Sequence, residues 1–241
     1  MIFGLPTFLP RACAFLSLAL TLAGCGAQQT ARIAEPVAPN ARYQALYAPQ
    51  PDEKFPIAAT DISRIDEQFL RTEVTYQTTE QPGTIVVDVP SRHLYLVLEN
   101  GRALRYGIGV GAEGMEWSGR AVVGRKAEWP RWTPTADMIE RDPERYGPWA
   151  EGMPPGLDNP LGARALYLYQ NGRDTLYRIH GTNEPHTIGE AVSSGCIRMI
   201  NQDIIDLYRR VPRDAAVVVL PDPSSGLTSA QPLPERAFIR F

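Results

Sequence analysis

The chain has 241 residues, of which 44% are hydrophobic, and this is enough apolar side chain for one packed domain with extensions. Its 24 basic and 27 acidic residues leave a net charge of −3, with neither a basic stripe nor an acidic tail. This balance argues against a nucleic-acid partner and against a strongly cationic one. Prolines gather in residues 34–56 and 212–234, which indicates extended segments near both ends.

The first 25 residues have the pattern of an export signal. Residues 12–23 form an uncharged, mostly apolar run after Arg11, and this run is too short to span a bilayer as a helix. Leu22-Ala23-Gly24-Cys25 then matches the lipobox of bacterial lipoproteins, in which the cysteine becomes lipidated. The alternative is an ordinary signal peptide with a chance cysteine. We expect a lipoprotein signal peptide over residues 1–24 and lipidation at Cys25.

The remaining chain divides into a tether, a domain and a tail. Residues 25–60 are rich in Ala, Pro, Gln and Thr without a sustained period, and predict a flexible tether. Residues 61–221 predict the folded domain, and residues 222–241 a Pro-rich C-terminal tail. Gly26, where inner-membrane lipoproteins of Gram-negative bacteria have aspartate, favours by resemblance a periplasmic protein held at the outer membrane by its lipid.

Strand patterns dominate the predicted domain. An Asn100-Gly101 pair between two apolar runs indicates a hairpin. Asn201 is a good N-cap for a helix that Pro212 ends, and the apolar spacing in residues 61–76 fits a short amphipathic helix. The predicted fold is therefore mainly β with a few helices. The predicted strands cover residues 84–89, 93–98, 103–110, 121–128, 164–170, 175–180 and 215–220.

A long stretch without a clear period, residues 129–163, interrupts the strands. It contains Trp129, Trp132 and Trp149. Long irregular loops in compact domains are often binding loops or lids, whereas tryptophans also pin packed surface loops. Both interpretations remain open from the sequence.

Cys196 and His180 are the residues on which a chemical interpretation depends. Cys196 is the one cysteine outside the N-terminal 25 residues, so within an exported domain it is either inert or reactive. A thiol attacks as the thiolate, and an imidazole can accept its proton. Backbone N–H groups beside Gly195 could stabilise an oxyanion, and Arg198 is placed to hold a carboxylate.

Two other interpretations of these residues stay open at this point. Cys196 can be a buried apolar residue and His180 a satisfied core histidine. His180, His186 and Cys196 could instead bind a metal, although their spacing fits no familiar zinc pattern.

Residues 83–221 resemble the catalytic domain of L,D-transpeptidases, the YkuD family. The matching segments are Ile179-His180-Gly181-Thr182-Asn183, Ser193-Ser194-Gly195-Cys196-Ile197-Arg198-Met199 with Asn201, and Asn159-Pro160-Leu161-Gly162. The resemblance implies a β-sandwich or barrel-like domain that needs no cofactor and no metal.

The resemblance also implies roles for individual residues. Cys196 becomes the nucleophile, His180 its base, and the backbone carbonyl of Gly181 orients the imidazole. Amides around Gly195 and Cys196 form the oxyanion hole, while Arg198 shapes the donor site. The neighbouring motif residues Ser193, Ser194 and Asn201 complete the binding pocket.

One residue of the cysteine motif departs from the family pattern. Ser194 stands where many members have histidine, which leaves the nucleophile and base intact but puts pocket polarity and substrate choice in doubt. His186 is an extra histidine of the intervening loop, and a structural or solvent-facing role suits it better than a catalytic one.

The implied reaction is acyl transfer on peptidoglycan stem peptides. Attack by Cys196 releases a terminal D-alanine and leaves a thioester, which an amine of a neighbouring stem resolves as a cross-link. If water resolves the thioester, the protein is an L,D-carboxypeptidase; if the amine is a lysine of an outer-membrane lipoprotein, it attaches protein to the wall. A non-catalytic wall-binding lipoprotein is the alternative from another class, and it would need neither Cys196 nor His180.

Overall fold

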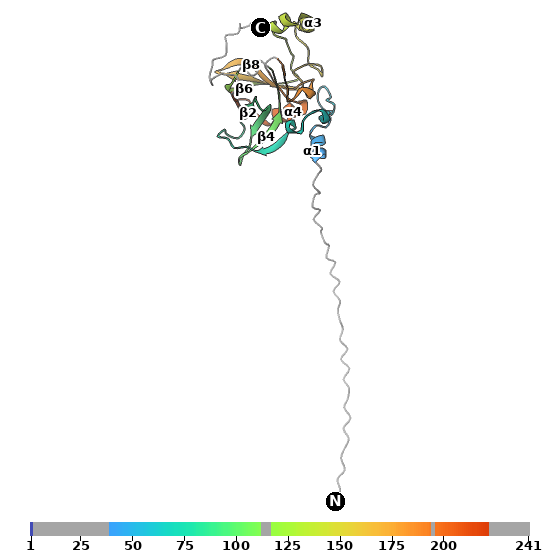
Figure 1. The fold of residues 1–241 in the computed structure, drawn as a ribbon, viewed down its shortest axis with the longest axis vertical. Helices are drawn as coiled ribbons and strands as arrows, with labels where there is room; N and C mark the ends of the chain where they lie inside the picture. The colour runs from blue at the N-terminus through green and yellow to red at the C-terminus, as the bar shows by residue number, and fades with distance from the viewer. Residues whose placement is uncertain (2–38, 112–116, 194–195, 222–241) are drawn as a thin grey trace. The chain divides into compact units, whose positions relative to one another are not determined.

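The computed structural model of the protein describes Met1 and residues 39–111, 117–193 and 196–221 (Figure 1). The predicted signal peptide, Cys25, the predicted tail and the motif residues Ser194 and Gly195 lie outside the described residues. Within those ranges, none of the helices combines the length and apolar character needed to cross a bilayer.

The strands form one eleven-stranded sheet in the order β1-β4-β3-β2-β11-β6-β7-β8-β10-β5-β9. This confirms the prediction of a mainly β domain with few helices. The predicted strand 103–110 is divided at Ile108, and the other predicted strands are present with small changes at their ends. The strands are β1 (Thr72–Thr75), β2 (Ile85–Asp88), β3 (His93–Val97), β4 (Arg102–Gly107), β5 (Gly109–Gly111), β6 (Gly119–Glu128), β7 (Arg164–Gln170), β8 (Arg173–His180), β9 (Ala191–Ser193), β10 (Ile197–Arg198) and β11 (Ala216–Val219).

The core gathers apolar side chains from distant strands around one helix. Ile85 of β2, Leu166 of β7 and Ile179 of β8 are fully buried in the same cluster as Ile204 and Leu207 of α4 (Asn201–Arg210). Figure 1 shows α4 among the strands, and burial of each such side chain contributes about 1.5–3 kcal/mol. The helix therefore packs against the sheet, at β7.

The other helices are short. They are α1 (Pro39–Leu46), α2 (Ala136–Arg141) and α3 (Pro143–Tyr146), with 3-10 turns at Ile62–Arg64, Glu67–Phe69, Gly147–Trp149 and Pro185–Thr187. Both α2 and α3 lie within the stretch 129–163, for which the sequence predicts no regular element.

The amphipathic helix predicted over residues 61–76 is absent from the structure, and this prediction is wrong. The side chain of Asp61 accepts a hydrogen bond from the Ser63 N–H, and Asp66 does the same for the Gln68 N–H. Each aspartate thus holds a single 3-10 turn, because its side chain competes with the helical backbone bond. The segment ends in β1, which pairs with β4.

Residues 47–70, which we call the N-terminal strap, belong to the same compact unit as the sheet. Part of this strap lies in the segment 25–60 that the sequence analysis assigned to a tether. Tyr47 is almost fully buried, donates to Asp203 of α4 at 3.0 Å, and accepts from the Arg71 N–H. Glu53 accepts hydrogen bonds from Trp129 and Arg164. Individual polar side chains thus attach the strap to the domain, and the overall composition of the segment gives no sign of these contacts.

The carboxylate of Asp203 is the most deeply buried charge that the strap contacts. Burial raises the pKa of Asp203 from 3.8 to about 7, although the Arg71 guanidinium, 3.6 Å away, and the bond from Tyr47 oppose the change. The nearby carboxylate of Asp206 adds to the increase. Because the folded-state pKa lies above the ordinary one, the native state binds this proton more tightly than the unfolded chain does. The resulting stability is complete below about pH 4 and is lost as the pH rises through 7.

The substitution Asp203→Asn tests this linkage. The amide stays neutral at every pH, so the variant lacks the titration. As the pH rises from about 5 to about 8, the free energy of unfolding of the unaltered protein should fall relative to that of Asp203→Asn. Urea denaturation at several pH values measures both. The exposed Asp52→Asn variant is the control and should follow the unaltered protein; parallel profiles for Asp203→Asn would contradict the assignment.

Candidate active site

The pairing of β8 with β10 brings together two segments that are distant in the sequence. The strands are parallel, with Ile179 opposite Ile197 and His180 opposite Arg198. Ile179 and Ile197 both point into the core cluster. Since side chains alternate along a strand, His180 and Arg198 share the other face, which we call the outer face. Cys196 directly precedes β10, and the same alternation assigns it to that face.

His180 is held in one orientation and one tautomer. Its Nδ1 lies 2.6 Å from the carbonyl oxygen of Gly181, and because a carbonyl only accepts, Nδ1 carries the proton. The Nε2 atom of the neutral ring is therefore a proton acceptor. The backbone is fixed as well, because the His180 carbonyl accepts from Met199 and the Gly181 N–H donates to Arg164.

Burial keeps this imidazole neutral. His180 is 5% exposed, and burial lowers its pKa from 6.5 to about 4. The hydrogen bond to Gly181 opposes this effect, whereas the positive charges of Arg198 and Arg178 reinforce it. At neutral pH the ring is thus uncharged and able to accept a proton, which is the state that a general base requires.

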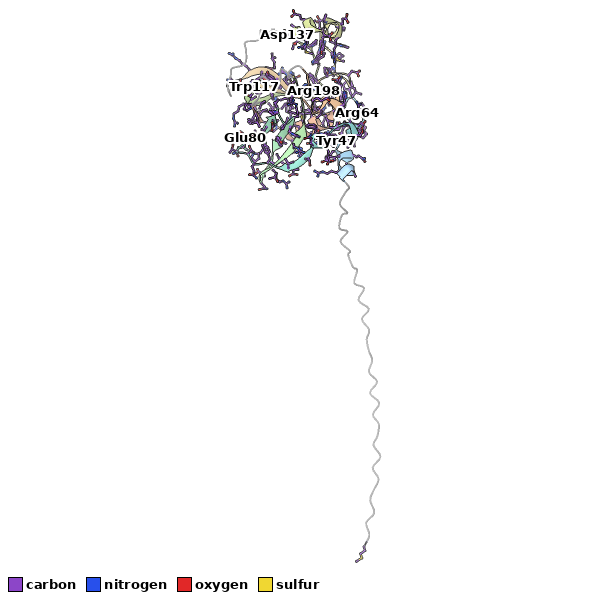
Figure 2. The ribbon with its side chains drawn as sticks, viewed as in Figure 1. Tyr47, Arg64, Glu80, Trp117, Asp137 and Arg198 are labelled. Carbon is purple, nitrogen blue, oxygen red and sulfur yellow. The ribbon has the colours of Figure 1, made fainter. Side chains whose placement is uncertain are left out.

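Arg198 presents one edge of its guanidinium without a hydrogen-bond acceptor. The residue is 6% exposed and lies well inside the domain (Figure 2). Among the described residues, its buried Nε and Nη2 atoms have no hydrogen-bond partner. These two atoms form the side edge with which arginine binds a carboxylate in a bidentate manner. Burial lowers the pKa of Arg198, and the charges of Glu184, Glu190 and Cys196 oppose this change.

Gly109 makes room for that guanidinium. It lies opposite Arg198 on the antiparallel strand β5. A Cβ atom at position 109 would be 3.0 Å from Nη2 and 3.3 Å from Nε of Arg198, closer than side chains normally approach. The glycine that the sequence places in this strand therefore allows the arginine to lie across the backbone.

Asn201 joins three segments around His180, and its predicted role as an N-cap is wrong. Ile200 occupies the N-cap position, and the Asn201 side chain points elsewhere. It accepts from the Ala163 N–H and donates to the Thr182 carbonyl, both at 2.9 Å. Side chains at Gly162 or Gly181 would collide with its amide oxygen. The matched motif at 159–162 is thus packed directly against the segment that follows His180.

The structure describes some of the remaining predicted site residues and not others. Cys196 is a thiol of intermediate exposure. Ser193 ends β9, opposite Gly111 of β5, and Ser194 and Gly195 are outside the described residues. His186 is exposed in the 3-10 turn Pro185–Thr187. Within the described ranges, no group of three or more His, Cys, Asp or Glu side chains could hold a metal ion.

The stretch 129–163 has features of both interpretations left open by its sequence. Trp129 is 4% exposed and donates to Glu53, so it pins the start of the stretch. Asn159 is buried near its end and donates to the carbonyls of Pro130 and Pro154. Trp149 is exposed by 37%. Packed ends and an exposed middle describe a loop with a rigid base.

Arg178 is a residue of the site that the sequence analysis missed. It lies two residues before His180 in β8, so alternation places it on the same face. Extending the parallel β8–β10 register by one residue beyond the Ile179–Ile197 pair puts Cys196 next to Arg178. Its charge lowers the pKa of His180. The period-two pattern of this strand was a signal that could have identified it.

Comparison with known proteins gives a family match over most of the described domain. Residues 82–219 match the family model described as YkuD, the L,D-transpeptidase catalytic domain. The probable L,D-transpeptidase ErfK/SrfK of Escherichia coli K12 is 39% identical over 58% of this chain and 44% of its own length. The probable L,D-transpeptidase YbiS of the same strain is 35% identical over 62% of this chain and 48% of its own length. The chain thus spans less than half the length of these curated relatives.

A solved structure from Brucella melitensis, described as a probable carnitine operon oxidoreductase, shares 52% sequence identity with this chain. The match covers 66% of this chain and 99% of that one, with a TM-score of 0.46. The description applies to that protein.

Proposed function

Because the chain belongs to the L,D-transpeptidase catalytic domain family, we propose that it is an L,D-transpeptidase acting on peptidoglycan stem peptides through a thioester on Cys196. The observation that carries the proposal is the outer face of the β8–β10 pair. A neutral histidine with a fixed tautomer and a buried arginine with an unused edge lie opposite each other there, beside the cysteine.

The first half-reaction uses Cys196 and His180. The strand spacing of about 4.8 Å and rise of about 3.3 Å per residue separate their Cα atoms by roughly 8 Å, which a thiol and an imidazole together can bridge. As the sulfur attacks the carbonyl carbon before a terminal D-alanine, Nε2 of His180 takes the thiol proton. The resulting imidazolium then protonates the departing amine, the C–N bond breaks, and a thioester remains.

The second half-reaction reverses the proton transfers. An acceptor amine attacks the thioester, His180 takes the amine proton, and Cys196 leaves as the thiolate and recovers that proton. General acid–base catalysis of this kind accelerates a reaction by about 10²–10⁴-fold. The amine of a neighbouring stem gives a cross-link, a lysine of an outer-membrane lipoprotein gives a protein attachment, and water gives the carboxypeptidase reaction.

Arg198 and the backbone of the cysteine motif complete the proposed site. The unused Nε–Nη2 edge of Arg198 suits the carboxylate of the leaving D-alanine, because a buried guanidinium gains a charge-assisted bidentate pair. Amides near Gly195 and Cys196 are proposed to stabilise the oxyanion, and the neighbouring motif residues Ser193 and Ser194 are proposed to contribute to substrate binding. Asn201 acts on the site through the segments that it joins.

The substitution Cys196→Ser tests the proposed nucleophile. A serine hydroxyl has a much higher pKa than a thiol, so we expect the release of D-alanine and the formation of new cross-links to be lost while the fold is retained. Muropeptide analysis after incubation with purified cell wall measures the products, and circular dichroism checks the fold. Retained turnover in Cys196→Ser would refute the mechanism, and the products of the unaltered protein distinguish cross-linking, trimming and protein attachment.

We further propose that lipid attached to Cys25 anchors the protein in the periplasm, at the outer membrane. Support comes from the sequence alone, in the apolar run 12–23 and the lipobox that follows it. An anchor of this type places the domain beside the cell wall.

The substitution Cys25→Ala tests this anchor in cells. We expect the variant to move from the membrane fraction to the soluble fraction, because the acyl chains that bind the membrane are no longer attached. Immunoblotting of fractions measures the change, with Cys13→Ala as the control that should stay with the membranes. Unchanged fractionation of Cys25→Ala would remove the lipoprotein assignment.

A further inference from the structure

A row of side chains crosses the outer face of three neighbouring strands, β8, β7 and β6, and starts next to Cys196, the residue before β10. The register places Tyr167 of β7 opposite Arg178 of β8, and Arg125 of β6 opposite Tyr167. Because β8 and β10 are parallel and Ile179 pairs with Ile197, extending that register by one residue puts Cys196 next to Arg178. The row therefore leads from the proposed nucleophile across β8 and β7 to β6.

A bulge in β6 directs Arg125 to this face. Val123 pairs with Leu168 and Arg125 with Tyr167, so Gly124 is an extra residue without a partner of its own. Val123 is fully buried in the core cluster, and in a regular strand the side chains at positions 123 and 125 would point the same way. The bulge therefore turns Arg125 to the opposite face. The Tyr169 ring lies over Gly124 and leaves no space for a Cβ atom. Bulges of this kind often redirect a side chain beside an active site.

The two arginines stack on the ring between them. The guanidinium carbon of Arg125 lies 3.5 Å from the centroid of the Tyr167 ring, and that of Arg178 lies 4.4 Å from it. Arg178 is committed to Asp174 through hydrogen bonds of 2.6 and 2.9 Å. Arg125 is exposed and forms no ion pair with any residue of the described ranges. Stacking fixes a guanidinium plane while leaving its N–H edges available to a planar anion.

We propose that Arg125, stacked on Tyr167, binds a carboxylate of the acyl-donor peptide on the side of the scissile bond that stays attached to Cys196. This inference rests on the proposed function. Three strand spacings separate Arg125 from Cys196, on the order of 14 Å, and an extended peptide covers about 3.5 Å per residue. With the reach of the arginine, the bound carboxylate belongs to a residue roughly two to four positions from the attacked carbonyl. Arg198 lies further along β10 and not across the sheet from Cys196. It therefore remains the proposed partner of the carboxylate on the departing D-alanine.

The test compares two donor tetrapeptides that end in D-alanine, one with free carboxylates upstream of the scissile bond and one with those carboxylates amidated. Thioester formation on Cys196, followed by intact-protein mass spectrometry, gives kcat/KM for each. For the free-carboxylate donor we expect Arg125→Gln to lower kcat/KM by roughly ten-fold, mainly through KM. For the amidated donor, Arg125→Gln and the unaltered protein should react alike.

A matched control removes a positive charge from an exposed arginine at the far end of β8. Arg173 is exposed at the start of β8, opposite Gln170, and Arg173→Gln should leave both donors unaffected. An equal loss with both donors, or no loss with either, would overturn the subsite while the proposed function stands. If the unaltered protein forms no thioester with the free-carboxylate donor, the proposed function fails together with the subsite.

Discussion

The parallel pairing of β8 with β10 is the constraint on which the proposed site depends. His180 and Cys196 are sixteen positions apart, and the segment between them leaves the sheet and returns. The register that aligns Ile179 with Ile197 puts both isoleucines into the core, so the polar residues next to them face the opposite way. A shift by one residue would bury Arg198 among apolar side chains, at a cost of several kcal/mol. Core packing therefore determines the geometry of the outer face.

Close backbone packing maintains that geometry around His180. The Gly181 carbonyl holds the ring nitrogen, and Asn201 ties the segment after Gly181 to the one that precedes β7. The glycines at 162 and 181 lie against the Asn201 amide, where no other side chain fits. This rigidity gives the imidazole a single orientation, and its burial keeps it neutral. An immobile, uncharged imidazole is the kind of base that the proposed proton transfer from Cys196 requires.

Local patterns predicted the mainly β fold and most strand positions, and the family resemblance supplied the three motif segments. The local patterns failed where one particular side-chain contact, local or distant, decides the backbone conformation. Asparagine is a common N-cap residue, but the side-chain amide of Asn201 hydrogen-bonds to the backbone of Ala163 and Thr182 instead. Aspartates at 61 and 66 replaced an expected helix with two turns. The bulge that turns Arg125 outward is indicated in the sequence only by a glycine inside a strand, and the packing of the Tyr169 ring of β7 over Gly124 is a contact that the β6 sequence does not show.

The central claim, that His180 takes the proton of Cys196, is tested most directly by alkylation of the thiol. The rate at which iodoacetamide modifies Cys196, measured by peptide mass mapping at neutral pH, should fall by at least about ten-fold in His180→Ala and remain unchanged in His186→Ala. A Cys196 that reacts equally fast in the unaltered protein and in folded His180→Ala, with the pH profile of an ordinary thiol, would contradict the account.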